Sequence, residues 1–200
     1  MFTTHDAIYT EEYYLRDVEG PASQAAPHIA RSIVEVFAPN TLIDVGCGTG
    51  AMMAALRDLG VRVSGLEYAA AGIRLCQQRG LDVRKFDIEN DMQPARETYD
   101  CAMSLEVAEH IPKRAAGRFV DLLCGLSDVV ICSAARPGQP GVDHVNLKPK
   151  SYWVEHFRQR GFALSGVTEV LSSRWQSAGI ADFYHGNLMV FCRTSSQGQS

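Results

Sequence analysis

The fold is decided by the stretch Ile43-Asp44-Val45-Gly46-Cys47-Gly48-Thr49-Gly50, which joins an apolar run, Thr41 to Val45, to an amphipathic segment over about Ala51 to Leu59. Short apolar runs rich in β-branched residues favour strands, and apolar residues at helical spacing favour helices. Glycine at every second position of the turn allows positive φ angles and lets a ligand approach the main chain closely. A strand, a glycine turn and a helix in this order are typical of doubly wound sheets, which bind nucleotides at the carboxyl ends of their strands.

The same unit repeats along the chain. Further strands are predicted over residues 61–67, 81–86, 99–104 and 128–134, and helices over residues 25–37, 69–79 (closed by Gly80), 113–126 and 149–160. The strand-like runs 162–171 and 186–193 have no long helix predicted between them, so we expect them to pair antiparallel. The pattern predicts an α/β fold, a Rossmann-like doubly wound seven-stranded sheet that is mostly parallel with an antiparallel last strand and helices on both faces.

Composition narrows the class of protein. Of 200 residues, 46% are hydrophobic and 21% are charged, which excludes disordered and collagen-like chains. The net charge of -4 and the scattered basic residues argue against binding to nucleic acid or to anionic membranes. The polar start lacks the features of a secretory signal and no apolar run could cross a bilayer, so we expect a cytoplasmic protein.

Six cysteines at irregular spacing, without a Cys-x-x-Cys pair, predict buried thiols. The length predicts one domain over residues 1–200. Within it we expect a helical cap (1–38), a ligand-binding core (39–193) and a flexible tail (194–200). No sequence pattern indicates an oligomeric state.

Two carboxylates follow the glycine turn at successive strand ends. Glu67 ends the second predicted strand, and Asp87 lies just past the third. A carboxylate in the first of these places accepts the hydroxyls of a ribose. The Gly-x-Gly-x-Gly spacing differs from the dinucleotide fingerprint, and Asp44 beside the turn would repel a pyrophosphate but attract an ammonium group. The ligand is therefore expected to carry a ribose, a base and a cationic amine.

Through DVGCGTG at residues 44–50, with Glu67 and Asp87, the chain resembles the class I S-adenosylmethionine-dependent methyltransferases over about Pro39 to Arg193. The resemblance implies methyltransferase activity with S-adenosyl-L-methionine as cofactor. It also implies that Asp44 and the glycine turn hold the methionine part, Glu67 the ribose and Asp87 the adenine amino group. The full set of cofactor-binding residues it implies is Asp44, Gly46, Cys47, Gly48, Gly50, Glu67, Tyr68, Asp87, Ile88, Leu105 and Glu106.

The segment from Ser104 to Ile111, SLEVAEHI, carries the candidate chemistry. If it is helical, Glu106, Glu109 and His110 share one face. The segment resembles quinone and natural-product O-methyltransferases, and by that resemblance Glu109 and His110 face the acceptor. We predict transfer to a hydroxyl oxygen of a small molecule, without a metal, in which His110 or His144 acts as general base and Glu109 orients.

Four alternatives stay open at this level. The acidic residues could simply stabilise a helix amino terminus. Glu106, Glu109, His110 and His144 together resemble the metal site of small-RNA 2′-O-methyltransferases, which would imply metal-dependent methylation of an RNA or nucleoside ribose. A small amine could be the acceptor, or the chain could be an inactive, cofactor-binding regulatory partner.

Three further segments are candidates for covering or lining the acceptor. The loop from Ala135 to Gly141 is a candidate lid. The tyrosines at positions 9, 13 and 14 either fold over the site or belong to a frayed terminus. Arg174 to Gln176 are predicted to wall the acceptor pocket, whereas Trp153 and Phe157 are predicted to pack a helix.

Overall fold

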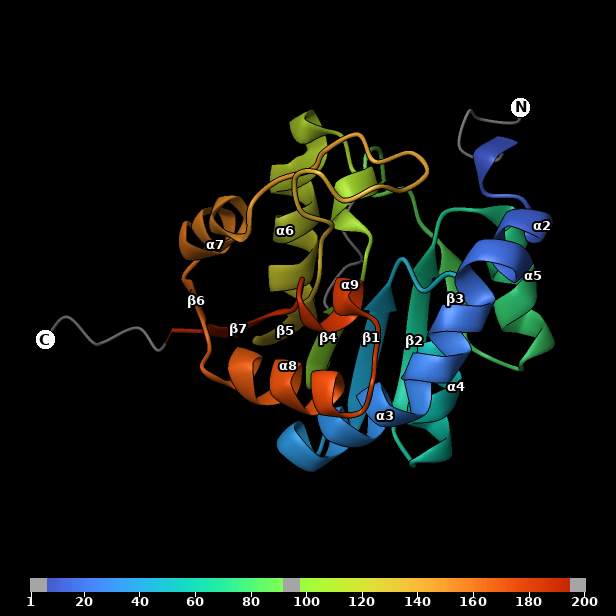
Figure 1. The fold of residues 1–200 in the computed structure, drawn as a ribbon, viewed down its shortest axis with the longest axis horizontal. Helices are drawn as coiled ribbons and strands as arrows, with labels where there is room; N and C mark the ends of the chain where they lie inside the picture. The colour runs from blue at the N-terminus through green and yellow to red at the C-terminus, as the bar shows by residue number, and fades with distance from the viewer. Residues whose placement is uncertain (1–6, 92–97, 195–200) are drawn as a thin grey trace, which may run out of the picture.

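The computed structural model describes residues 7–91 and 98–194, in which one seven-stranded sheet has the order β3-β2-β1-β4-β5-β7-β6 (Figure 1). The strands are β1 (Thr41–Val45), β2 (Arg62–Glu67), β3 (Val83–Lys85), β4 (Cys101–Ser104), β5 (Val129–Cys132), β6 (Phe162–Leu164) and β7 (Met189–Arg193). β7 runs antiparallel to both of its neighbours, and the other pairs are parallel. The predicted α/β fold with an antiparallel last strand is confirmed. The tail predicted over residues 194–200 lies, apart from Thr194, outside the described residues.

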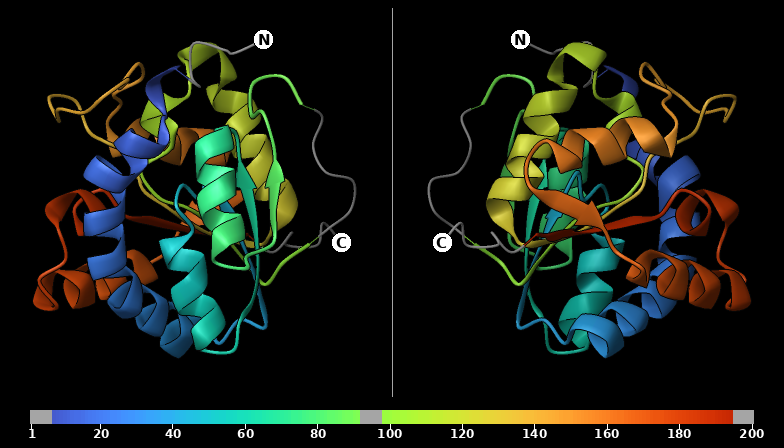
Figure 2. Two further views of the ribbon diagram at one scale, coloured as in Figure 1. Left: turned by 90° about the vertical axis from the view of Figure 1, so that its right-hand side faces the viewer. Right: turned by 90° about the vertical axis from the view of Figure 1, so that its left-hand side faces the viewer.

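Helices cover both faces of the sheet (Figure 2). They are α2 (Glu11–Tyr13), a π-helical turn (Tyr14–Val18), α3 (Glu19–Phe37), α4 (Ala51–Asp58), α5 (Ala70–Gln78), α6 (Ala116–Leu126), α7 (Lys150–Arg158), α8 (Val167–Ser177) and α9 (Asp182–His185), with 3-10 turns at Ala108–His110 and Lys113–Ala115. Leu42 on β1 packs in a cluster with α3, α4 and α8, whereas the next residue, Ile43, packs in a cluster with α6 and α7. The alternation of side chains along each central strand thus divides the core into two layers.

The predicted strand over residues 162–171 is wrong over most of its length. Residues 162–171 form a strand only as far as Leu164, and the remainder begins α8, which lies between β6 and β7 in the chain. The two strands pair antiparallel as predicted, but they do not form a hairpin. Leu171 and Trp175 are both fully buried against α3, because they lie one helical turn apart on the same face of α8.

The helix proposed over residues 104–111 is also absent. Ser104 ends β4, Glu106 has a positive φ of 54°, and only Ala108–His110 form a 3-10 turn. The side chains in this segment are therefore directed by a sharp turn after the strand, and helical spacing does not apply to them.

The cysteine prediction is confirmed for five of the six thiols, since only Cys192 is partly exposed. Trp153 and Phe157 lie on the buried face of α7, as predicted. No helix within residues 7–91 and 98–194 combines the length and apolar character that crossing a membrane requires.

Candidate functional site

A cavity of about 700 Å³ lies at the carboxyl ends of β1, β2 and β4. α2 and the loop after β5 lie at this same end of the sheet (Figure 1). Of the predicted site residues, those that line the cavity are Asp44, Gly46, Cys47, Gly48, Glu67, Tyr68, Asp87, Ile88, Leu105, Glu106, Glu109, His110 and His144. The cavity therefore includes every predicted site residue except Gly50.

The glycine turn is held against β2, and at Gly46 it leaves no room for a side chain. The main-chain N–H of Gly46 donates to the carbonyl of Leu66 at 2.8 Å. Gly46 has a φ of 76°, and a Cβ there would approach Val107 to 2.6 Å. The turn thus requires glycine both for its backbone angles and for its packing.

Gly50 serves the fold and not the cavity surface. It precedes α4 with a φ of 77°, and a Cβ there would meet Leu81 and Cys76. It allows α4 to begin directly after the turn and to pack closely against the neighbouring elements.

Asp44 and Glu67 are buried carboxylates at the ends of neighbouring strands, with exposed fractions of 4% and 7%. Burial, together with the charge of Glu67, raises the pKa of Asp44 to about 8. Burial also raises the pKa of Glu67, although hydrogen bonds to its carboxylate oppose the shift. Two buried carboxylates that have no basic partner among the described residues favour the binding of a cation or of hydroxyl donors.

Glu67 also holds this edge of the sheet together through hydrogen bonds. One of its oxygens accepts the N–H of Gly48 at 2.8 Å, and the other accepts the N–H groups of Tyr68 and Ala69, each at 2.9 Å. The hydroxyl of Tyr14 donates to the latter oxygen at 3.3 Å. Glu67 therefore links the glycine turn, the end of β2 and the amino-terminal segment.

Asp87 caps the turn that follows β3. Its carboxylate accepts the N–H groups of Glu89 and Asn90 and the side-chain amide of Asn90, at 2.8 to 3.2 Å. The side chain lies at the cavity, so this capping role accompanies the predicted contact with adenine, which stays a prediction.

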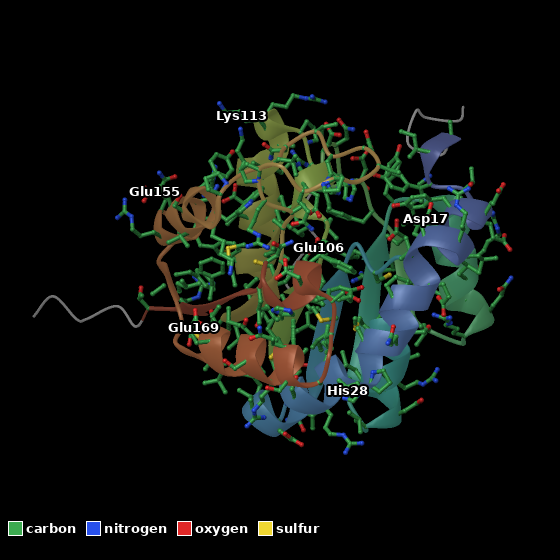
Figure 3. All side chains as sticks on the ribbon, viewed as in Figure 1. Asp17, His28, Glu106, Lys113, Glu155 and Glu169 are labelled. Carbon is green, nitrogen blue, oxygen red and sulfur yellow. The ribbon has the colours of Figure 1, made fainter. Side chains whose placement is uncertain are left out.

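Glu106 lies in the interior of the molecule, whereas Lys113 and Glu155 lie at its periphery (Figure 3). The carboxylate of Glu106 accepts a hydrogen bond from the side-chain amide of Asn187 at 3.1 Å, and that amide also donates to the side-chain oxygen of Gln139 at 3.0 Å. Asn187 is completely buried and was missed from the sequence, since a lone asparagine before a strand carries no distinctive pattern.

Glu109, His110 and His144 form a cluster in which each residue offers a ligand atom and these atoms lie within 4.8 Å of one another. Glu109 is 1% exposed, and neither of its carboxylate oxygens receives a hydrogen bond from the described residues. Burial and the neighbouring charge of Glu106 raise the pKa of Glu109 well above its usual value. His144 Nε2 lies 4.0 Å from Glu109 Oε1. The structure thus joins two imidazoles and a poorly satisfied carboxyl in one wall of the cavity.

The loop after β5, which includes the candidate lid, takes part in holding this cluster. The N–H groups of Val145 and Asn146 donate to the carbonyl of Glu109 at 3.0 and 2.9 Å. His144 Nδ1 lies 3.2 Å from the carbonyl of Gln139, and a Cβ on Gly141 would overlap the imidazole of His144. The loop therefore carries His144 into the site.

The amino-terminal tyrosines fold over the site, so the alternative of a frayed segment is wrong for residues 9, 13 and 14, all of which line the cavity. Asp143, which no sequence pattern singles out, accepts the hydroxyl of Tyr9 on its carboxylate at 3.1 Å.

The proposed wall at Arg174 to Gln176 is wrong. Trp175 is buried in the core and donates through Nε1 to Ser32 at 2.7 Å, while Arg174 pairs with Glu35 on the surface. These residues belong to α8 and lie outside the cavity lining.

Carboxylates dominate the charge around the cavity. The described carboxylates in its lining are Asp17, Asp44, Glu67, Asp87, Glu89, Glu106 and Glu109. Arg114 is the one Lys or Arg among the described lining residues, and Glu89 binds it at 2.6 Å. The cavity is suited to a cationic ligand.

Part of the chain is similar in sequence to known proteins. The model of a family described as "Methionine biosynthesis protein MetW" matches residues 29–130. A ubiquinone biosynthesis O-methyltransferase of Methylobacterium sp. (strain 4-46) is 34% identical over 110 residues, which are 52% of this chain and 40% of that protein. The chain therefore matches less than half of that relative's length.

Solved structures share the fold at low sequence identity. Magnesium protoporphyrin IX methyltransferase from Synechocystis PCC 6803, solved with bound SAM, has a TM-score of 0.68 at 16% identity and covers 96% of this chain and 99% of its own. A 1,6-didemethyltoxoflavin-N1-methyltransferase of Burkholderia thailandensis has a TM-score of 0.64 at 19% identity and covers 98% of this chain and 92% of its own. These likenesses establish the Rossmann-like methyltransferase fold.

Proposed function

The chain belongs to the MetW family and to the class I S-adenosylmethionine-dependent methyltransferases, and we propose that it transfers a methyl group from S-adenosylmethionine to a hydroxyl oxygen of a small molecule. The single observation that carries the proposal is the cluster of Glu109, His110 and His144 in the same cavity as the glycine turn. The name of the curated relative, an O-methyltransferase, supports the choice of oxygen as acceptor atom.

The residues around the turn fit the cofactor. Burial raises the pKa of Asp44 to about 8, and an ammonium group bound beside it would favour the ionised carboxylate and be attracted by it. Gly46 and Gly48 have positive φ angles and line the cavity with main chain. In this assignment Asp44 and the turn hold the methionine part, Glu67 the ribose hydroxyls, and Tyr68, Asp87 and Ile88 the adenine.

When bound, S-adenosylmethionine supplies a methyl group on a positively charged sulfur. The chain's own contribution is to orient the acceptor and to accept its proton. His110 or His144 accepts the proton of the attacking hydroxyl, a role that is worth about 10² to 10⁴ in rate. Glu109 orients the imidazoles, and the loop from Ala135 to Gly141 together with Tyr9 closes the cavity against water.

The test is an assay with methyl-labelled S-adenosylmethionine and a library of small hydroxyl- and amine-bearing acceptors. We expect one methyl group on a hydroxyl oxygen of the product. The variants His110→Ala and His144→Ala should keep wild-type cofactor affinity, and loss of the base should lower turnover by about 10² to 10⁴. His28→Ala is the matched control, because His28 is exposed on α3, far from Glu106 (Figure 3). Methylation of amines alone, or full turnover by both site variants, would contradict the proposal.

A second candidate function is metal-assisted transfer, including transfer to a ribose hydroxyl. The observation that favours it is that Nδ1 of His110 and Nδ1 of His144 each face a main-chain carbonyl, at 3.1 and 3.2 Å. Histidine ligands of metals commonly use one nitrogen in this way, which leaves the other for the ion. Loss of activity in EDTA and its return with Mg²⁺, Mn²⁺ or Zn²⁺ would favour this candidate, and unchanged activity in EDTA would favour the metal-free mechanism.

A further inference from the structure

His110 is held on one side by two groups from distant parts of the chain. Its Nδ1 lies 3.1 Å from the main-chain carbonyl of Asp143 and 3.0 Å from the hydroxyl of Tyr9. The ring of Tyr9 meets the imidazole edge-on, with centroids 5.9 Å apart. The amino-terminal segment and the loop after β5 therefore converge on the same nitrogen of the same histidine.

The direction of these hydrogen bonds follows from what each group can do. A carbonyl oxygen only accepts, so Nδ1 must carry the hydrogen that it donates to Asp143. The Tyr9 hydroxyl uses its single hydrogen on the carboxylate of Asp143, at 3.1 Å, and its oxygen then shares the one Nδ1 hydrogen with the carbonyl of Asp143. Of the two neutral tautomers of His110, both contacts thus favour the one that has its hydrogen on Nδ1, in which Nε2 carries none.

The backbone around Asp143 is arranged for this contact. Asp143 has a φ of 58°, a conformation uncommon outside glycine, which aspartate adopts more readily than most residues. The two residues that follow His144 donate their N–H groups to the carbonyl of Glu109, which ties the loop to the turn that carries His110. Through this geometry Asp143 presents its carbonyl to His110 and its carboxylate to Tyr9.

We propose that Tyr9 and Asp143 are positioning residues, which fix His110 in the tautomer whose Nε2 can accept a proton in the site. The proposal rests on the proposed function for its effect on rate, but the tautomer itself requires neither cofactor nor acceptor. A purely structural role would predict that Tyr9 only tethers the amino-terminal segment, with no effect on where the imidazole hydrogen resides.

The test compares wild type with Tyr9→Phe, which removes the hydroxyl and keeps the ring. ¹⁵N-histidine correlation spectra in mildly alkaline buffer, assigned with His110→Gln, report which ring nitrogen of His110 carries the hydrogen. We expect Nδ1–H in wild type. In Tyr9→Phe we expect a larger fraction of the other tautomer and a kcat lower by about three- to tenfold, with an unchanged KM for S-adenosylmethionine.

Two controls accompany this variant. The signals of His144, whose Nδ1 faces Gln139, should not change. Tyr13→Phe removes a neighbouring hydroxyl and should leave the His110 spectrum as in wild type. Asp143→Asn keeps the backbone conformation accessible and, because it removes the charge that holds the Tyr9 hydrogen, should shift the His110 spectrum in the same direction as Tyr9→Phe.

The outcomes separate this inference from the proposed function. Nε2–H in wild type, an unchanged spectrum in Tyr9→Phe, or an unchanged kcat despite a changed spectrum would overturn the positioning role. The absence of methyl transfer by the wild-type protein would contradict only the proposed function, since the spectra are recorded without cofactor or acceptor.

Discussion

Replacing Asp44 by asparagine should make the protein more stable, by an amount that grows with pH. The carboxyl is 4% exposed, and burial raises its pKa from 3.8 to about 8. A pKa that is higher in the folded than in the unfolded chain means that stability is lost as the pH rises from the lower value to the higher one. At pH 7 the difference amounts to about 4 kcal/mol, at about 1.4 kcal/mol for each pH unit above 3.8.

The side-chain amide of the Asp44→Asn variant cannot ionise, so the variant does not lose this stability as the pH rises. The gain should be near zero at about pH 4 and should level off above about pH 8. For a chain of this size, ~4 kcal/mol corresponds to a rise in Tm of about 8 to 16 °C at neutral pH. Urea unfolding of cofactor-free wild type and variant across this range measures the difference directly. Parallel stability curves, or a less stable variant at pH 8, would refute the reasoning.

The same variant should bind the cofactor more weakly, because an amide does not attract an ammonium group as a carboxylate does. Stability gained together with affinity lost would identify Asp44 as a residue kept for binding and not for folding.

Three further outcomes follow from individual contacts. Tyr14→Phe removes the hydroxyl that donates to Glu67, and the affinity for S-adenosylmethionine measured by calorimetry should fall by up to about tenfold; unchanged affinity would contradict the role of that contact. Gly141→Ala should lower turnover but not cofactor affinity, since the added methyl group would displace the imidazole of His144. An unchanged kcat would contradict a role for His144 in turnover. Trp175→Phe should lower the free energy of unfolding by about 1 to 3 kcal/mol, through the lost bond to Ser32 and a small cavity, with no change in KM.

Much of the fold could be predicted because strand ends and glycine turns are local signals. β1 matches its predicted range, Thr41–Val45, to the residue, since a Pro-Asn turn and a glycine turn bound it. The helix α8 was missed because Val167, Thr168 and Val170 have a local preference for strands. The burial of Leu171 and Trp175 against α3 overrides that preference, and this packing is not visible in a short window of sequence.

The site could be predicted where the sheet edge determines it. Asp44 and Glu67 come together because parallel strands end at one edge, which needs no knowledge of side-chain packing. The pairing of His110 with His144 followed from the resemblance alone. Tyr9 and Asp143 could not be paired from the sequence, because their contact joins two irregular segments that are 134 residues apart.

The assignment of the cavity as an S-adenosylmethionine site is tested most directly by calorimetric titration of the wild-type protein with S-adenosylmethionine and with S-adenosylhomocysteine. We predict one site per chain for which the two ligands compete, with weaker binding in Glu67→Gln, because that variant replaces the carboxylate assigned to the ribose hydroxyls. No heat of binding for either ligand at millimolar concentration would contradict the account.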